Sequence, residues 1–238
     1  MCVYCGGVAD TSDHTPPRAF LPRKLPQGIQ AMTIPACRAC NAGYSQDEVR
    51  AAAVVSTVSF TASDRRATAP GGWLHTAMNR DQALARFIAD RMGDDGIFQV
   101  DEIVVKTLSR VMIKSAVGLI FFEFGRIVPR DHVTVLAIEH AKNVVPEAMM
   151  ELFRCVDGGW AEVTPSGREL EREVMAVAGI PPRHTTPWKI YVPDFFEYNF
   201  LRRSNNTLLC AMKLHEALTV LVECPWPSRA GPRRRGKP

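Results

Sequence analysis

The sequence lacks any uninterrupted apolar run long enough to span a bilayer. Its richest run, AVGLIFFEF, is short and is interrupted by Glu123. The chain also lacks an opening basic stretch followed by an apolar one, so we expect no secretory signal and a cytoplasmic location. We find no internal repeat, and the histidines show neither HxH nor HExxH spacing. These absences argue against a membrane-spanning protein, a repeat protein and an HExxH metalloprotease.

The charge balance is only mildly basic. The chain has 238 residues and a formal net charge of +4, which is compatible with a nucleic-acid partner but does not establish one. The length allows either one sizeable core or a small module followed by a larger domain.

Cysteine is scarce, but it is strongly clustered. Four of the 7 cysteines form two CxxC pairs, Cys2 with Cys5 and Cys37 with Cys40. Each CxxC places two thiolates on one tight turn, and two such turns brought together give the tetrahedral four-sulfur site that Zn²⁺ prefers. Because four sulfurs leave no open position for a substrate, we expect this zinc to be structural. The other three cysteines have apolar neighbours and are predicted to be buried thiols: Cys155, Cys210 and Cys224.

The segment between the two pairs carries the remaining signal. It contains Asp13-His14-Thr-Pro-Pro, and Asn41 directly follows the second CxxC pair. Residues 2 to 50 resemble the HNH endonuclease family, whose core is a ββα-metal fold. The stretch KSAVGLIFFEFGRIVP more weakly resembles uncharacterised bacterial HNH proteins with a helical C-terminal region.

The resemblance implies a role for each matching residue. Asp13 and Asn41 would hold Mg²⁺ or another divalent metal, and His14 would be the general base for the attacking water. Phosphodiester hydrolysis needs an activated water and stabilised negative charge, which an imidazole and a hard cation supply. The structural alternatives are a capping or solvated His14 and an Asn41 that serves as a turn residue.

One position departs from the family pattern. The middle Asn of the HNH motif, which holds the histidine loop in place, corresponds to Met32 here. Met accepts hydrogen bonds weakly and donates none. The alternative hypothesis is therefore a degenerate HNH module, stapled by zinc, that binds nucleic acid or a partner without catalysis.

Charged residues flank the motif on both sides. We expect the basic side chains Arg18, Arg23, Lys24 and Arg38 to contact nucleic acid, with DNA as the first candidate, although a solvated charged face is the common alternative.

Ser45 and Glu48 have capping-box spacing and predict the start of the α element. For Asp47 and Glu48, capping and the helix dipole are preferred over a metal-ligand role.

The predicted fold class is α+β, in three parts. Residues 1–60 form the ββα zinc module, 61–228 a mixed helical and β-rich domain, and 229–238 a basic disordered tail. Within the second part we predict helices over 79–92 and 101–124, shorter helices over 145–156 and 169–179, and two strand segments joined through Arg-Arg-Ser-Asn-Asn. This part carries no predicted chemistry, and homodimerisation through it is a further hypothesis.

Overall fold

The computed structural model describes residues 1–59, 72–140, 189–202, 206–215 and 217–226. The described chain is α+β, as predicted. Its N-terminal elements are β1 (Thr11–His14), the 3-10 turn η1 (Arg18–Phe20), β2 (Thr33–Ala36), α1 (Arg38–Ala42) and α2 (Ser45–Val58). The later helical elements are α4 (Trp73–Arg80), α5 (Gln82–Ala89), α6 (Glu102–Phe124) and the 3-10 turn η2 (Arg130–His132). The later strands are β3 (Thr134–His140), β4 (Lys189–Val192), β5 (Phe196–Arg202), β6 (Thr207–Leu214) and β7 (Leu218–Pro225).

The N-terminal elements follow a ββα order. β1 and β2 pair antiparallel, with Thr11 opposite Ala36 and His14 opposite Thr33. The short α1 and the longer α2 then follow along the chain. This hairpin sets the site, because it places the start of β1 beside the end of β2, which leads directly into the second CxxC pair, and the end of β1 beside the start of β2.

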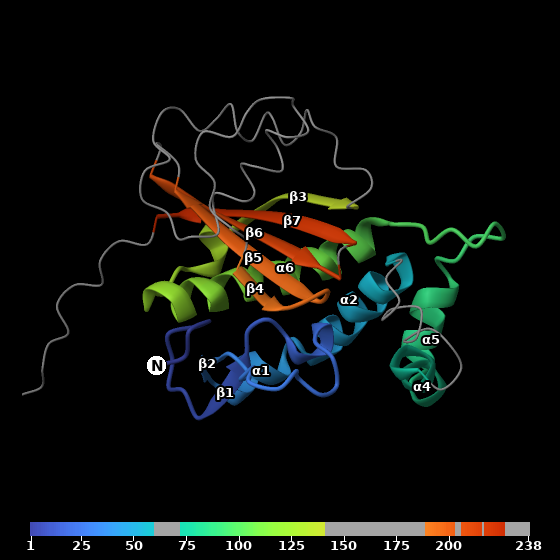
Figure 1. Ribbon diagram of the computed structural model, residues 1–238, viewed down its shortest axis with the longest axis horizontal. Helices are drawn as coiled ribbons and strands as arrows, with labels where there is room; N and C mark the ends of the chain where they lie inside the picture. Colours follow the sequence, from blue (N-terminus) through green and yellow to red (C-terminus); the bar gives the residue numbers. More distant parts are fainter. Residues whose placement is uncertain (60–71, 141–188, 203–205, 216, 227–238) are drawn as a thin grey trace, which may run out of the picture.

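Helix α6 lies at the centre of the molecule, between the ββα elements and the sheet (Figure 1). It starts where the Asp101 side chain accepts a hydrogen bond from Val104 N at 2.9 Å, and it ends at Gly125, which has a φ of 64°. All residues from 114 to 120 are buried, so α6 is covered on every side over these two turns. None of the helices that the structure describes combines the length and the apolar character needed to cross a bilayer.

The C-terminal strands form one antiparallel sheet in the order β3-β7-β6-β5-β4. The strand segments on either side of Arg-Arg-Ser-Asn-Asn do pair, as β5 with β6, but each predicted segment is itself a hairpin. The extra turns occur where Asp194 and His215 adopt left-handed backbone, with φ of 65° and 50°. The aromatic residues of β5 face the core rather than solvent, since Phe196, Tyr198 and Phe200 are all buried.

The helix predicted over 79–92 is two helices. Chain direction changes at Asp81, whose carboxylate accepts hydrogen bonds from Ala83 N and Leu84 N and so begins α5. The helices predicted over 145–156 and 169–179, and the tail at 229–238, lie outside the described residues.

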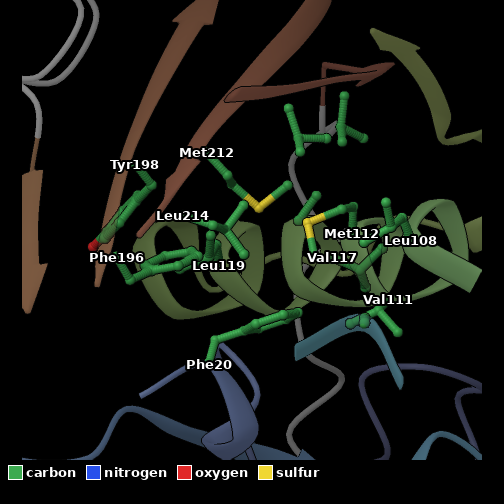
Figure 2. Packing of buried hydrophobic residues seen from close by; sticks show 14 of the residues in the cluster. Phe20, Leu108, Val111, Met112, Val117, Leu119, Phe196, Tyr198, Met212 and Leu214 are labelled. Atoms are coloured by element: carbon green, nitrogen blue, oxygen red, sulfur yellow. The ribbon is translucent and has the colours of Figure 1, made fainter. Parts of the chain in front are cut away.

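One hydrophobic core joins the ββα elements to the later part of the chain. Phe20 lies below α6 in Figure 2, while Tyr198 and Met212 of the sheet lie above it and Phe196 lies beside it. The Phe20 carbonyl oxygen lies 2.9 Å from His215 Nε2. The predicted boundary near residue 60 falls in undescribed chain, and the core extends across it.

Gly118 is a point of close approach between α6 and the residue that follows β1. A Cβ at this position would lie 2.5 Å from Thr15 Oγ1 and 2.9 Å from Thr15 Cβ. We expect Gly118→Ala to lower the free energy of unfolding by about 1–3 kcal/mol, although alanine is the better helix former. Urea denaturation measures the change, with Ser109→Ala on the same helix as the control. A Gly118→Ala protein as stable as the wild type would contradict this close packing.

Candidate metal centre and histidine site

The two CxxC pairs occupy turns that the backbone itself closes. In the first turn, Cys2 N donates to Gly7 O at 2.7 Å, and Cys5 lies within this loop. In the second, Cys37 caps α1, with its Sγ accepting a hydrogen bond from Cys40 N at 3.4 Å. Cys37 is thus the N-cap residue of α1, and Cys40 lies in the first turn of the same helix.

The four sulfurs converge as the spacing predicts. The Sγ atoms of all four cysteines lie within 4.8 Å of one another, and Cys5 Sγ is 3.8 Å from Cys37 Sγ. A tetrahedral site with Zn–S bonds of about 2.3 Å has S···S edges of about 3.8 Å. The residues present therefore fit a closed four-sulfur zinc site: Cys2, Cys5, Cys37 and Cys40. When bound there, zinc supplies the cross-link that holds the N-terminal turn to α1.

The electrostatics of the cluster also favour a cation. Burial, together with the neighbouring sulfurs of Cys37, Cys5 and Cys2, raises the pKa of Cys40 to about 12. Burial opposes ionisation of Cys2 as well, but backbone N–H groups of Cys37 and Cys5 lower the pKa of Cys2 to about 7. The cluster therefore does not hold four thiolates by itself. A divalent cation removes the repulsion between them.

A cationic residue from the second part of the chain lies beside this centre. Burial would lower the pKa of Arg130, but contact with Tyr44 Oη and the charges of Cys40 and Cys5 raise it overall. Arg130 donates a hydrogen bond to Tyr44 Oη. The η2 turn thus places positive charge next to a cluster that carries a net negative charge when it binds zinc.

Asp13 and His14 point to opposite sides of β1. Asp13 is buried and His14 is half-buried, as the alternation of a strand requires. Asn41, on α1, donates from Nδ2 to Ser12 O at 3.1 Å. The structure therefore brings Asn41 to the strand that carries His14, but it turns the Asp13 side chain away towards α6.

Both oxygens of Asp13 face protein groups, one through a hydrogen bond and the other through an ion pair alone. Oδ1 accepts a hydrogen bond from His14 N at 2.8 Å, and Oδ2 lies 2.6 Å from Lys114 Nζ. A divalent metal takes oxygen ligands directly and keeps several waters. Asp13, only 4% exposed, does not fit that role in this arrangement.

Sequence reasoning missed Lys114. This residue is fully buried, and its ammonium pairs with both Asp13 and Glu48. It lies in the middle of the apolar helix sequence RVMIKSAVGL. A charged residue at such a position is the one feature of the sequence that indicates a buried ion pair. Lysine is almost never fully buried without a partner.

The predicted capping box does not form. Ser45 is already helical, and the N-cap residue, Tyr44, makes no side-chain capping bond. Glu48 pairs instead with Lys114, and Asp47 pairs with Arg110 at 2.6 Å. Arg110 and Lys114 are four residues apart on α6, so they present their charges on one face to two neighbouring acids of α2.

Met32 supports the histidine loop through its backbone. Met32 O accepts a hydrogen bond from Thr15 N at 3.0 Å, directly after His14, and Met32 N lies 3.0 Å from Tyr191 Oη. The Met32 side chain is buried in the core. Main-chain hydrogen bonds therefore hold this loop without a polar side chain at position 32.

The predicted nucleic-acid contacts separate into two kinds. The guanidinium of Arg18 donates to Pro22 O and Arg23 O, so it closes its own loop. The side chains of Arg23, Lys24 and Arg38 are exposed and available to a partner.

Comparison with known proteins adds no relationship. No family model matches the chain, and neither the curated proteins nor the solved structures include a significant match. The similarity to the HNH family therefore stays a hypothesis, based on the motif residues and the element order.

Proposed function

We propose that this chain is an HNH-type endonuclease that hydrolyses phosphodiester bonds, with His14 as the general base. Three features support the proposal. The described chain has a ββα element order, its four-cysteine cluster fits zinc, and a half-buried histidine ends β1. The substrate class is nucleic acid, with DNA as the first candidate.

The observation that carries the proposal is the way in which the backbone around His14 is held. His14 N donates to Asp13 Oδ1 at 2.8 Å. The preceding carbonyl, Ser12 O, accepts from Asn41 Nδ2, and the following amide, Thr15 N, donates to Met32 O. Fixed backbone on both sides of a partly exposed imidazole is what a preorganised base requires. A merely solvated histidine needs no such support.

The residues of the chain divide the chemistry as follows. His14 takes the proton of the attacking water. Burial raises the pKa of Glu48, and the charge of Lys114 and, to a smaller extent, that of a protonated His14 act against the rise. We assign no step to a cation at Asp13, because both oxygens of Asp13 are engaged.

Digestion of supercoiled plasmid, linear DNA and RNA by zinc-loaded protein tests the proposal. The reactions are run with Mg²⁺, Mn²⁺, Ca²⁺ or no added ion, and binding is measured in parallel by fluorescence anisotropy. We expect cleavage of at least one substrate, and the Discussion gives the matching His14 variant. Tight binding without cleavage under every condition would reject the hydrolase.

A second candidate is a zinc-stapled nucleic-acid-binding module without catalysis. It is favoured by the buried pairing of Asp13 with Lys114, which removes a carboxylate from the predicted catalytic metal. Met32, in place of the middle Asn, points the same way. Salt-dependent binding without cleavage is the outcome that would support this candidate.

Both candidates predict a role for the exposed basic residues. We expect replacement of Arg23, Lys24 and Arg38 by alanine to weaken DNA binding. Every phosphate that the protein no longer neutralises should reduce the slope of log K against log salt by about 0.9. Anisotropy titrations at several salt concentrations measure the slope, and Lys106→Ala, at an exposed position of α6, is the control. An unchanged slope in the triple variant would exclude these residues from the interface.

A further inference from the structure

We propose that the Lys114 ammonium is the resident cation of the ββα site, in the place for which the family resemblance implies a divalent metal beside Asp13. Three elements converge there, because β1 supplies Asp13, α2 supplies Glu48 and α6 supplies Lys114. The cation therefore belongs to the chain itself and comes from the part of the sequence that carries no predicted chemistry.

Charge and burial support this assignment. The Lys114 side chain is 1% exposed, and those of Asp13 and Glu48 are 6% and 16% exposed. Two buried carboxylates that face each other without a cation repel, and one must take up a proton or a cation. Burial raises the pKa of Glu48, and the Lys114 charge acts against that rise. Lys114 thus supplies the compensating charge that the pair requires.

The surroundings of Lys114 are also those of a cation site. Its Nζ lies 5.6 Å from the ring centroid of Tyr4 and 5.3 Å from that of Tyr44, within the range of cation–π attraction. The Tyr4 hydroxyl is buried and, within the described residues, makes no hydrogen bond. Carboxylates and aromatic faces enclose the ammonium, and a hydrated Mg²⁺ would need room for its waters.

The assignment makes Lys114 a positioning residue. A side chain with 1% exposure does not reach a substrate, but it fixes Asp13, and Asp13 Oδ1 holds the amide of His14. This second consequence rests on the proposed function of His14. The cation assignment itself rests only on the buried cluster.

Thermal unfolding of zinc-loaded protein tests the assignment without a nuclease assay. The variants are Lys114→Met, the double variant Lys114→Met with Asp13→Asn, and the matched control Lys106→Met, which removes an exposed ammonium from the same helix. Melting temperatures are compared with and without millimolar Mn²⁺. Zinc content is measured in each sample, so that exchange at the cysteines is detected.

We expect Mn²⁺ to leave the melting temperatures of the wild type and of Lys106→Met unchanged. Lys114→Met should melt on the order of 10 °C lower, because its two carboxylates lose their partner. Mn²⁺ should then raise the melting temperature of Lys114→Met by about 5 °C, by binding where the ammonium was. Adding Asp13→Asn should recover part of the loss and abolish the response to Mn²⁺.

Three results would overturn the assignment. They are a wild-type melting temperature that rises with Mn²⁺ in an Asp13-dependent way, a Lys114→Met protein as stable as Lys106→Met, and a double variant that recovers nothing. If Lys114→Met is insoluble, soluble expression of the double variant supports the assignment, and insolubility of both contradicts it. A failure to detect cleavage leaves all of these readouts intact, so the two proposals fail separately.

Discussion

Replacing His14 with alanine should reduce the rate of DNA cleavage by about 10²–10⁴-fold, the usual contribution of a positioned general base. The melting temperature should stay within about 2 °C of the wild type, because the imidazole is half-buried and leaves the core intact. Initial rates of plasmid nicking and a thermal melt of the same preparation measure both quantities. The large loss of rate without loss of stability is what distinguishes a base from a structural residue.

The control for this experiment is His132→Ala. His132 is exposed in the η2 turn and should keep the wild-type rate. Binding of DNA by His14→Ala should also remain, because the exposed basic side chains are unchanged. If His14→Ala cleaves DNA at the wild-type rate, His14 is not the general base.

Cys40→Ser should release the zinc and unfold the N-terminal module. Apparent binding energies of structural zinc sites are about 10–16 kcal/mol near neutral pH, more than the whole stability of many domains. The effect should extend beyond the module, because Cys2 and Val3 belong to the same core as α6 and the sheet. Zinc content by mass spectrometry and circular dichroism before and after a chelator measure the loss.

Cys210→Ala is the matched control for the zinc experiment. Cys210 is a buried thiol of β6, so its replacement should cost some stability through packing but leave the zinc content unchanged. Acid should mimic Cys40→Ser, since protonation of thiolates displaces zinc. A Cys40→Ser protein that retains one zinc per chain, or a chelated protein that stays fully folded, would contradict a structural zinc site.

The four-cysteine cluster was predictable because its signal is local. Two CxxC turns determine the ligand set from spacing alone, and the structure adds only the distances between sulfurs. The stripe along α6 was also predictable, since Val104, Leu108, Met112 and Ala116 recur at helical spacing and are all buried.

The cation beside Asp13 was not predictable in the same way. Lys114 lies 101 positions after Asp13 in the chain (114 − 13), and only the packing of α6 against β1 brings the two together. The spacing of Ser45 and Glu48 predicted a capping box because that pattern is local. The partner that Glu48 binds, Lys114, lies far along the chain, and no local pattern indicates it. The break at Asp81 had a local signal, an N-cap residue inside a helical pattern, but continuous apolar periodicity outweighed it.

Anomalous scattering from crystals of zinc-loaded protein soaked in Mn²⁺ tests the arrangement of the site most directly. We predict one zinc peak between the four sulfurs and no manganese peak at Asp13, with the Lys114 ammonium seated between the Asp13 and Glu48 carboxylates. A manganese ion bound by Asp13, with Lys114 displaced, would contradict the site that we describe, and so would cysteines without zinc.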